Sequence, residues 1–259
     1  MNRARVITST VLLIILIFVL TLSGCKKSPE IKKEITISVA ASLKEPLNEI
    51  IKTFEKDRGI KVNLNLGGSG TLQKQIEEGA EVDLFISAAY ENMKKLDNKG
   101  LIEENSIMNL LGNSLVIIAH NSNEKIDSIA GLINKNIIFA LGETKTVPAG
   151  IYGKQSLEKL EVWNLLQSKI VYAKDVKQVL EYVEKGEAQA GIVYKSDAIN
   201  LKNSYIVQTI PESTHEEIIY PIGKIKGSNK KEEVNEFIKY ITNSQSDEIF
   251  IKYKFKVLN

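Results

Sequence analysis

Short runs rich in valine, isoleucine and leucine recur along this chain, and the segments between them carry apolar residues at helical spacing. The runs lie at residues 35–40, 61–66, 83–88, 115–119, 136–140 and 191–194. Their length and composition are typical of buried strands. Because strands and helices alternate along the chain, the pattern predicts an α/β fold.

The clearest helices in this pattern are amphipathic, and two of them can end at a glycine. One has apolar residues at positions 43, 47, 50, 51 and 54 before Gly59, and the other has them at 179, 180 and 183 before Gly186. Two further helices are predicted at 231–242 and 246–253. They would complete the fold at the carboxyl-terminal end.

The length of the alternating region indicates two lobes rather than one. About 225 residues exceed what one compact unit usually needs, so we expect two lobes, each a mostly parallel sheet flanked by helices. Residues 110–120 are predicted to cross into the second lobe, and residues 220–224 to return. The predicted first lobe comprises residues 34–112 and 224–259, and the second comprises residues 113–223.

The amino-terminal segment has a different character. Arg3 and Arg5 precede an unbroken apolar run at 11–20, which is followed by Leu22-Ser23-Gly24-Cys25. This order predicts a secretion signal over residues 1–24. A transmembrane anchor is the alternative, at the short limit of length for a bilayer. The last four residues also resemble the bacterial lipobox, which implies a lipid on Cys25 and a polar tether over residues 25–33.

The number of cysteines and the balance of charged residues exclude or disfavour several classes of function. Cys25 is the only cysteine, so an internal disulfide and a thiolate metal cluster are excluded. The chain has 34 basic and 32 acidic residues, and removal of residues 1–24 leaves 32 of each. Such scattered, balanced charge does not favour a nucleic-acid partner. Attraction for a charged ligand must therefore come from local groups.

Four predicted strand-to-helix junctions carry the candidate chemistry. In open α/β sheets, ligands bind at the carboxyl ends of strands, and a helix start adds unpaired backbone N–H groups that suit an anion. The junctions are at Ser42, in the glycine-rich residues 67–72, at Pro148 and at Asp175. The glycine-rich segment lacks the spacing of a nucleotide P-loop, so ATP and GTP are disfavoured.

Purely structural interpretations of these residues stay open. Ser42 and Glu45 fit a capping box, which would make Ser42 an ordinary helix cap. Asp175 can cap its own helix and leave the Val176 amide free to face a ligand. Tyr194, at the end of the last apolar run, can donate one hydrogen bond to a ligand or be a tyrosine of the core.

Taken together, these segments resemble the molybdate-binding proteins of ABC importers, within the bacterial solute-binding superfamily. The resemblance covers nearly the whole chain after residue 33. Its motifs are AASL at 40–43, GSGTLQKQIEEGAEVDLFISA at 68–88, LLGNSLV at 110–116, VPAGIYGKQSL at 147–157, DVKQVLEYVEKGEA at 175–188 and GIVYKSDA at 191–198. The resemblance is specific because so many motifs match in the same order.

The resemblance implies the type II periplasmic-binding-protein fold, with the ligand in a cleft between the lobes. It also implies a ligand set. By motif, this set falls on the hydroxyls and amides of Ser42 and Ser69, the backbone amides of Ala149 and Val176, and the hydroxyl of Tyr194. The first two residues belong to one predicted lobe and the other three to the second.

The resemblance further implies molybdate or tungstate as ligand, no cofactor, no catalysis, and an ABC permease with its ATPase as partners. We expect a monomer outside the cytoplasm, held at the membrane by lipid on Cys25. One departure concerns Gly68 and Gly70, which flank Ser69 where some relatives carry serines. Thr71 is then the reserve candidate for a further hydroxyl.

A pocket made only of N–H and O–H donors suits molybdate, tungstate and sulfate, because these dianions carry no proton near neutral pH. Monohydrogen phosphate carries one and needs an acceptor, so it should bind poorly, at a cost of about 1–3 kcal/mol or more. Either Glu143 or Asp175 would supply such an acceptor if its side chain entered the cleft. Discrimination between molybdate and sulfate is expected to depend on cavity size.

Three other functions remain as alternatives. A carrier of sulfate or another oxyanion would use the same chemistry. An enzyme is disfavoured because His120 and His215 lie in no metal-ligand spacing and no nucleophile with an adjacent base stands out. An anion-sensing domain of a regulator is disfavoured by the export signal and by the lack of a DNA-binding segment.

Overall fold

The computed structural model describes residues 33–121, 125–134 and 137–258. The predicted signal peptide, Cys25 and nearly all of the tether therefore lie outside the described residues. Lys33–Asn259 form one compact unit with its own core, so we expect this part to fold without residues 1–32. Within the described residues, no helix has the length and apolarity needed to cross a bilayer.

The first lobe is built on a six-stranded sheet in the order β11-β4-β10-β3-β1-β2. β1 (Glu34–Ala40) pairs in parallel with β2 (Lys61–Gly67) and β3 (Leu84–Ile86). β10 (Ile219–Lys224) is antiparallel to β3 and to β4 (Met108–Gly112), which is also antiparallel to β11 (Lys256–Val257). The parallel strands β1, β2 and β3 end at one edge, because Ala40 pairs with Gly67 and Val39 with Ile86.

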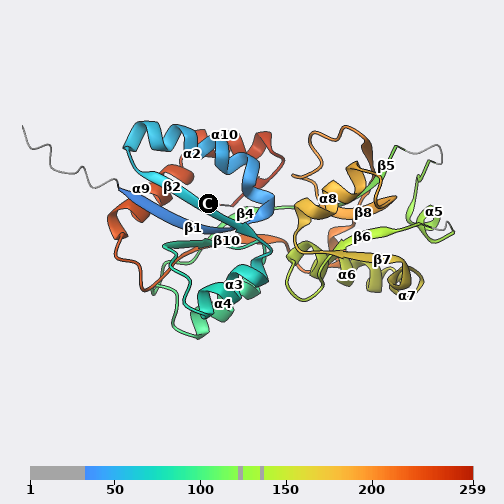
Figure 1. Ribbon diagram of the computed structural model, residues 1–259, viewed down its shortest axis with the longest axis horizontal. Coiled ribbons are helices and arrows are strands. Elements are labelled where there is room, and N and C mark those ends of the chain that lie inside the picture. The colour runs from blue at the N-terminus through green and yellow to red at the C-terminus, as the bar shows by residue number, and fades with distance from the viewer. Residues whose placement is uncertain (1–32, 122–124, 135–136, 259) are drawn as a thin grey trace, which may run out of the picture. The chain divides into compact units, whose positions relative to one another are not determined.

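Helices cover both faces of this sheet (Figure 1). The helices α2 (Lys44–Arg58), α9 (Lys231–Ile241) and α10 (Ser244–Lys252) lie on one face, and α3 (Ser69–Glu77) and α4 (Tyr90–Asn98) on the other. The predicted apolar face of α2 is buried, and its Phe54 ring meets the Phe237 ring edge-on, with centroids 5.1 Å apart. α2 ends at Gly59, whose φ of +66° favours glycine.

The second lobe is built on a five-stranded sheet in the order β7-β6-β8-β5-β9. β6 (Phe139–Gly142) is parallel to β7 (Ile170–Ala173) and β8 (Ala190–Tyr194), whereas β5 (Leu115–His120) is antiparallel to β8 and β9 (Ser204–Thr209). Its helical segments are α5 (Ile129–Asn134), α6 (Pro148–Lys159), α7 (Trp163–Leu166), η2 (Gln167–Lys169), α8 (Val176–Glu184) and η3 (Glu212–Thr214). As in the first lobe, the parallel strands end at one edge.

The predicted α/β fold with two lobes is confirmed, and its strand directions are more mixed than expected. Each sheet combines parallel and antiparallel pairs, because the chain reverses where it crosses between lobes. Asn113 and Ser114 connect β4 of the first sheet with β5 of the second. The predicted boundary at 223/224 falls inside β10, which pairs in the first sheet. We therefore propose that the second lobe ends before Ile219.

Candidate functional site

Two buried serines occupy neighbouring strand ends in the first lobe. Ser42 lies in the short helix η1 (Ala41–Leu43), directly after β1, and Ser69 is the first residue of α3, after β2. Because Ala40 pairs with Gly67, the parallel register brings the two junctions side by side. Ser42 is 3% exposed and Ser69 is fully buried.

The second lobe supplies two more strand-to-helix junctions and one strand end at the edge of its own sheet. Ala149 is the second residue of α6 and Val176 is the first residue of α8, so neither amide has an acceptor within its helix. Tyr194 is the last residue of β8. The pairing of Gly142 with Ala173 aligns the ends of β6 and β7 and so brings the two helix starts together.

All five predicted ligand residues line one cavity of about 10 Å³, to which both lobes contribute. This volume is close to what one water molecule needs, so a larger ligand requires the walls to move apart. The walls are held together across the lobes by a hydrogen bond of 2.9 Å from Gly70 N–H to the Thr146 carbonyl. A cleft of about 390 Å³ adjoins the cavity and shares Ala41 and Asp175 with it.

Glycine is needed where the two backbones approach. A Cβ on Gly70 would lie 2.8 Å from Thr146 Cα, and one on Gly68 would lie 2.9 Å from the Lys174 carbonyl oxygen. The Gly70 N–H donates to the Thr146 carbonyl, so it is not available to a ligand in the cavity. Among these residues, Ser69 remains the candidate donor.

The Ser69 hydroxyl is held as a donor by the backbone. Its Oγ accepts a hydrogen bond of 2.9 Å from the N–H of Ala88, two residues after β3. A hydroxyl has one proton, and here it is left for another acceptor. The Ser69 N–H, at the start of α3, adds a second potential donor.

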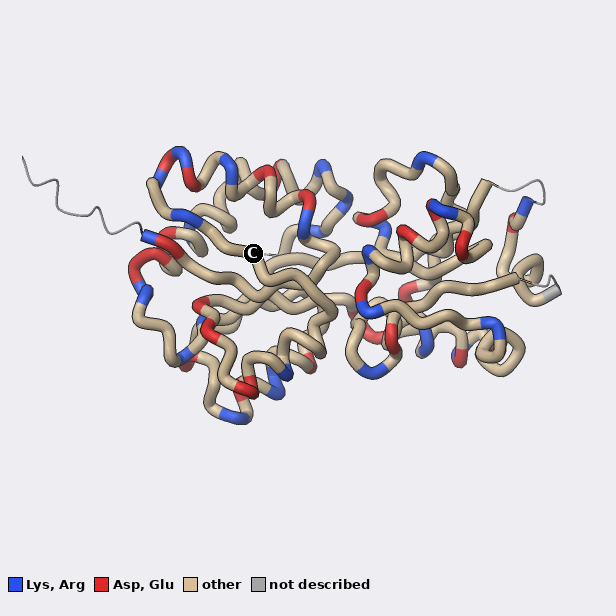
Figure 2. The backbone as a smooth tube through the Cα atoms, in the orientation of Figure 1, with Lys and Arg blue, Asp and Glu red and all other residues tan. Residues whose placement is uncertain are grey.

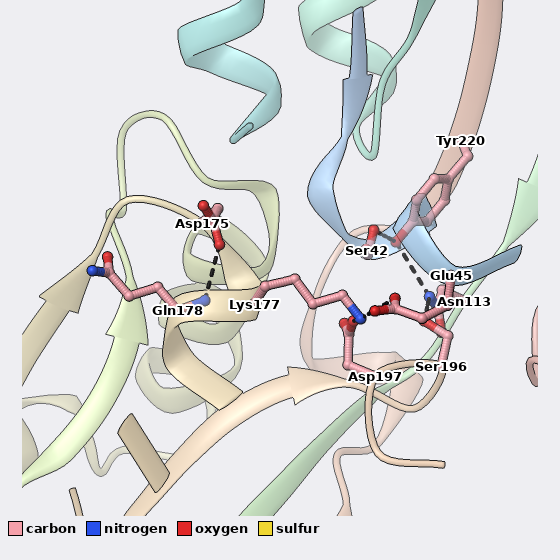
Figure 3. Close-up of polar contacts among 9 residues, drawn as sticks. All are labelled: Ser42, Glu45, Asn113, Asp175, Lys177, Gln178, Ser196, Asp197 and Tyr220. Carbon is pink, nitrogen blue, oxygen red and sulfur yellow. Dashed lines mark hydrogen bonds and ion pairs between the residues drawn. The ribbon is translucent and has the colours of Figure 1, made fainter. Parts of the chain in front are cut away.

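The capping-box interpretation of Ser42 is wrong. The N-cap of α2 is Leu43, and no side chain caps this helix. The Ser42 Oγ instead lies 2.9 Å from the hydroxyl of Tyr220, on β10, while Glu45 contacts Lys177 (Figure 3). A one-turn 3-10 segment precedes α2 and moves Ser42 away from the capping position.

The capping role of Asp175 is confirmed, and it engages one oxygen of a carboxylate that also lines the cavity. Asp175 Oδ1 accepts a hydrogen bond of 2.9 Å from Gln178 N–H in the first turn of α8 (Figure 3). The carboxylate is thus used at the helix start, beside the free Val176 amide. Glu143, the other carboxylate near the motifs, is exposed and does not line the cavity.

Tyr194 has an unsatisfied hydroxyl on the cavity. The side chain is 1% exposed, and its hydroxyl has no partner with hydrogen-bond geometry within the described part of the chain, although the Tyr220 hydroxyl is close enough to affect its pKa. Burial raises the pKa of the phenol well above its usual value, so it keeps its proton and can donate. Leaving such a group unpaired costs about 1–3 kcal/mol, which a ligand oxygen would recover.

The charges around the cavity are paired. Lys177 Nζ lies 2.5 Å from Glu45 of the first lobe and 2.9 Å from Asp197 of the second (Figure 3). Burial raises the pKa of Asp197 to about 6, although the Lys177 charge acts in the opposite direction. Farther out, Figure 2 shows acidic and basic residues interspersed over both lobes. The cavity itself is lined by dipoles and small residues rather than by an unpaired cation.

Several residues near the site were not predicted from the sequence: Asn113, Tyr220 and the group Glu45, Lys177 and Asp197. Asn113 and Tyr220 are 107 positions apart and meet only because the chain crosses between lobes twice. Their positions in the two predicted crossing segments were the one available signal. The charge cluster had no signal, because its members belong to three separate elements.

The histidines do not form a metal site. The His120 Nδ1 lies 2.9 Å from the Val183 carbonyl oxygen, and the His215 Nδ1 lies 2.7 Å from that of Glu216. Within the described ranges, no group of three or more histidine, cysteine, aspartate or glutamate side chains could hold a metal ion.

Comparison with known proteins adds three observations. The family described as "Bacterial extracellular solute-binding protein" matches residues 35–256. The chain is 42% identical to "Putative ABC transporter substrate-binding lipoprotein YvgL" of Bacillus subtilis, over 91% of this chain and 93% of that protein. It is 38% identical to "Molybdate-binding protein ModA" of Escherichia coli, over 86% of this chain and 89% of that protein.

A solved structure, the "substrate binding domain of putative molybdenum ABC transporter from Clostridium difficile", is 36% identical and covers 87% of this chain and 99% of its own, with a TM-score of 0.67. The family match spans both lobes and all five residues on the cavity. The chain therefore belongs to the bacterial extracellular solute-binding protein family, in the group that includes the molybdate-binding proteins.

Proposed function

We propose that this protein is the substrate-binding lipoprotein of a molybdate ABC importer, which captures the oxyanion and delivers it to the permease and its ATPase without catalysing a reaction. The observation that carries the proposal is the gathering of five potential donors from both lobes on one cavity, where the buried Tyr194 hydroxyl lacks an acceptor. The names of the relatives support the choice of ligand and of importer.

The proposed ligand is held by dipoles instead of salt bridges. Hydrogen bonds to a charged group contribute about 1.5–3 kcal/mol each, so several donors can offset the dehydration of a dianion. The starts of α3, α6 and α8 add the positive ends of three helix dipoles. Since donors come from both lobes, the anion stabilises the state in which the lobes are together. That state is the conformational signal for the permease.

The donor set also accounts for selectivity. Ser69 accepts from a backbone N–H, and Asp175, the carboxylate on the cavity, has its Oδ1 engaged by the Gln178 N–H at the helix cap, so both are partly used as acceptors. Monohydrogen phosphate would therefore bind poorly. Sulfate and tungstate have the same charge and shape as molybdate and differ in size, so a carrier of another fully deprotonated oxyanion is the alternative. The protein is expected to bind tungstate as well as molybdate.

Calorimetry with a panel of anions tests the function. For residues 26–259, we expect heat and tight binding with molybdate and tungstate, weaker binding with sulfate and little with phosphate. Ligand at about 100 times its Kd should add about 2.7 kcal/mol to the free energy of unfolding, which a thermal melt would show. Absence of both signals with molybdate would refute the assignment, and tighter binding of sulfate would favour the alternative carrier.

The membrane anchor is a separate prediction, because Cys25 is outside the described residues. We expect the full chain to enter the membrane fraction of a bacterial host, with a mass increase at its amino terminus that matches lipid on Cys25. A Cys25→Ser variant should lose that modification and move to the soluble or secreted fraction. Ser204→Cys is the control for a cysteine inside the fold, since Ser204 is buried on β9. Unchanged fractionation of Cys25→Ser would exclude the lipid anchor.

A further inference from the structure

A chain of buried hydrogen bonds leads from the first crossing between the lobes to the cavity. Asn113 Nδ2 lies 3.2 Å from the Tyr220 hydroxyl, which lies 2.9 Å from Ser42 Oγ (Figure 3). The exposed fractions are 5% for Asn113, 0% for Tyr220 and 3% for Ser42. Water therefore does not compete for these groups, and each proton must go to a protein partner or to a ligand.

The direction of this chain follows from its first member. The Ser114 N–H donates to Asn113 Oδ1 at 2.9 Å, so the oxygen of the Asn113 amide faces Ser114. The two Nδ2 protons then face Ser196 Oγ, at 2.9 Å, and the Tyr220 hydroxyl. With both protons used in this way, Asn113 is a donor to Tyr220 and cannot accept from it.

The direction of the hydrogen bond from Asn113 also influences the direction in which Tyr220 donates. The Tyr220 oxygen accepts from Asn113, which favours donation of its single proton to Ser42 Oγ, 2.9 Å away. Full burial raises the pKa of Tyr220 above its usual value, so this proton is retained. Since Ser42 Oγ accepts from Tyr220, its own proton is left for the cavity, which Ser42 lines.

We propose that Asn113 and Tyr220 are positioning residues that hold the Ser42 hydroxyl as a donor to the bound anion and so contribute to the exclusion of protonated oxyanions. This inference deepens the proposed function and depends on it. A serine that turned its lone pairs to the cavity could accept the proton of monohydrogen phosphate. The relay, the hydrogen bonds from Asn113 through Tyr220 to Ser42, uses one of these lone pairs and so favours Ser42 as a donor to the cavity.

An Asn113→Asp variant tests the direction of the relay. The carboxylate keeps the shape of the amide and still accepts from Ser114 N–H, but it accepts from Tyr220 instead of donating. Tyr220 would then accept from Ser42, and Ser42 would present a lone pair to the cavity. The added negative charge weakens the binding of every dianion, so the informative quantity is the ratio of the Kd values for phosphate and molybdate near pH 8, where both are dianions.

For Asn113→Asp, we expect this ratio to fall about tenfold or more relative to the unchanged protein, as one donor-to-acceptor reversal predicts. Asn92→Asp is the matched control, because Asn92 is a buried amide in α4 that does not line the cavity. It should leave the ratio unchanged. A thermal melt of each variant verifies that it is folded.

A Tyr220→Phe variant tests the middle of the relay without a change of charge. It keeps the ring, which packs on Phe255 with centroids 5.4 Å apart, and removes the hydroxyl. We expect molybdate binding to weaken about threefold to tenfold, the effect of one lost neutral hydrogen bond, while phosphate binding does not weaken. Tyr240→Phe is the control, since its hydroxyl donates to Asp57 at 2.9 Å and does not line the cavity.

An unchanged phosphate-to-molybdate ratio in Tyr220→Phe would overturn the relay, as would the same result in a folded Asn113→Asp variant. Failure of the proposed function is a different result, because the unchanged protein would then not bind molybdate at all. An equal loss for both anions would also overturn the relay, since it would indicate a structural role alone.

Discussion

Replacement of Tyr194 by phenylalanine should weaken molybdate binding about 5-fold to 150-fold and should not destabilise the ligand-free protein. The loss corresponds to about 1–3 kcal/mol for one hydrogen bond to an anion. Because the hydroxyl is buried and lacks a partner with hydrogen-bond geometry among the described residues, its removal should raise the free energy of unfolding without ligand by up to about 1 kcal/mol. Calorimetry and urea unfolding measure the two effects.

The opposite signs make this prediction specific. A tyrosine with only a structural role would lose stability and keep its affinity, as we expect for Tyr240→Phe, whose hydroxyl is satisfied by Asp57. Ser42→Ala should weaken binding in the same range as Tyr194→Phe, without a gain of stability, because it leaves the Tyr220 proton unpaired. Tyr194→Phe with the affinity of the unchanged protein would remove this residue from the binding site.

The largest loss of stability is expected for Lys177→Met. Lys177 is paired with Asp197, whose side chain is fully buried, and removal of one partner of a buried ion pair costs about 3–5 kcal/mol. The variant also loses the contact from α8 to Glu45 in the first lobe. Urea unfolding near pH 8 should show the full loss. The double variant Lys177→Met with Asp197→Asn should recover most of it.

The effect should depend on pH in a defined direction. The folded-state pKa of Asp197 is about 6, above its ordinary value of 3.8, so the folded protein binds this proton more tightly than the unfolded chain. The free-energy cost of ionising Asp197 in the folded protein is absent below about pH 4. It grows between about pH 4 and pH 6 and is complete above about pH 6. Loss of Lys177 raises this pKa further. The destabilisation should therefore be smaller near pH 5 than near pH 8.

Lys185→Met is the matched control for this experiment. Lys185 pairs with Glu181 on the surface of α8, where the two side chains are 62% and 64% exposed. Such pairs contribute about 0–1 kcal/mol, so this variant should stay close to the unchanged protein at both pH values. If Lys177→Met were equally mild, or if its effect did not change with pH, Asp197 would not be the buried charge that the structure indicates.

The neutral donors on the cavity and the charged residues beside it have separate roles. Dipoles and hydroxyls line the cavity, whereas the charges of Lys177, Glu45 and Asp197 are used beside it, in pairs. A cation at the anion itself would attract phosphate as strongly as molybdate, since charge alone does not distinguish a protonated from an unprotonated dianion. Neutral donors with a defined direction can distinguish them.

Much of the fold could be predicted from apolar spacing, because that spacing is a local property of the chain. The strands at 35–40, 61–66 and 115–119 and the helix ended by Gly59 lie close to their predicted positions. The strands β4, β7, β9, β10 and β11 were not predicted as strands, and 136–140 was placed too early for β6. β9 and β11 lie at sheet edges, where solvent contact weakens the apolar pattern.

The site was predictable where it consists of local junctions, and it was misread where its contacts are distant. Asp175 caps the helix that starts at the next residue, so its role depended on neighbours in the sequence. Ser42 looked like a cap for the same reason, but its partner is Tyr220, 178 positions away. A local rule cannot weigh such a partner against a helix N–H.

The sequence by itself determined the alternation of strands and helices, the division into two lobes, the junctions at which donors gather and, through its motifs, the family. Only the tertiary structure decided which hydroxyls have partners, in which direction their protons point, and that Lys177 lies between two carboxylates. The physical reason is that helix starts and apolar faces arise from residues a few positions apart. Burial and hydrogen-bond direction arise from segments that meet only after the chain has crossed twice between its sheets.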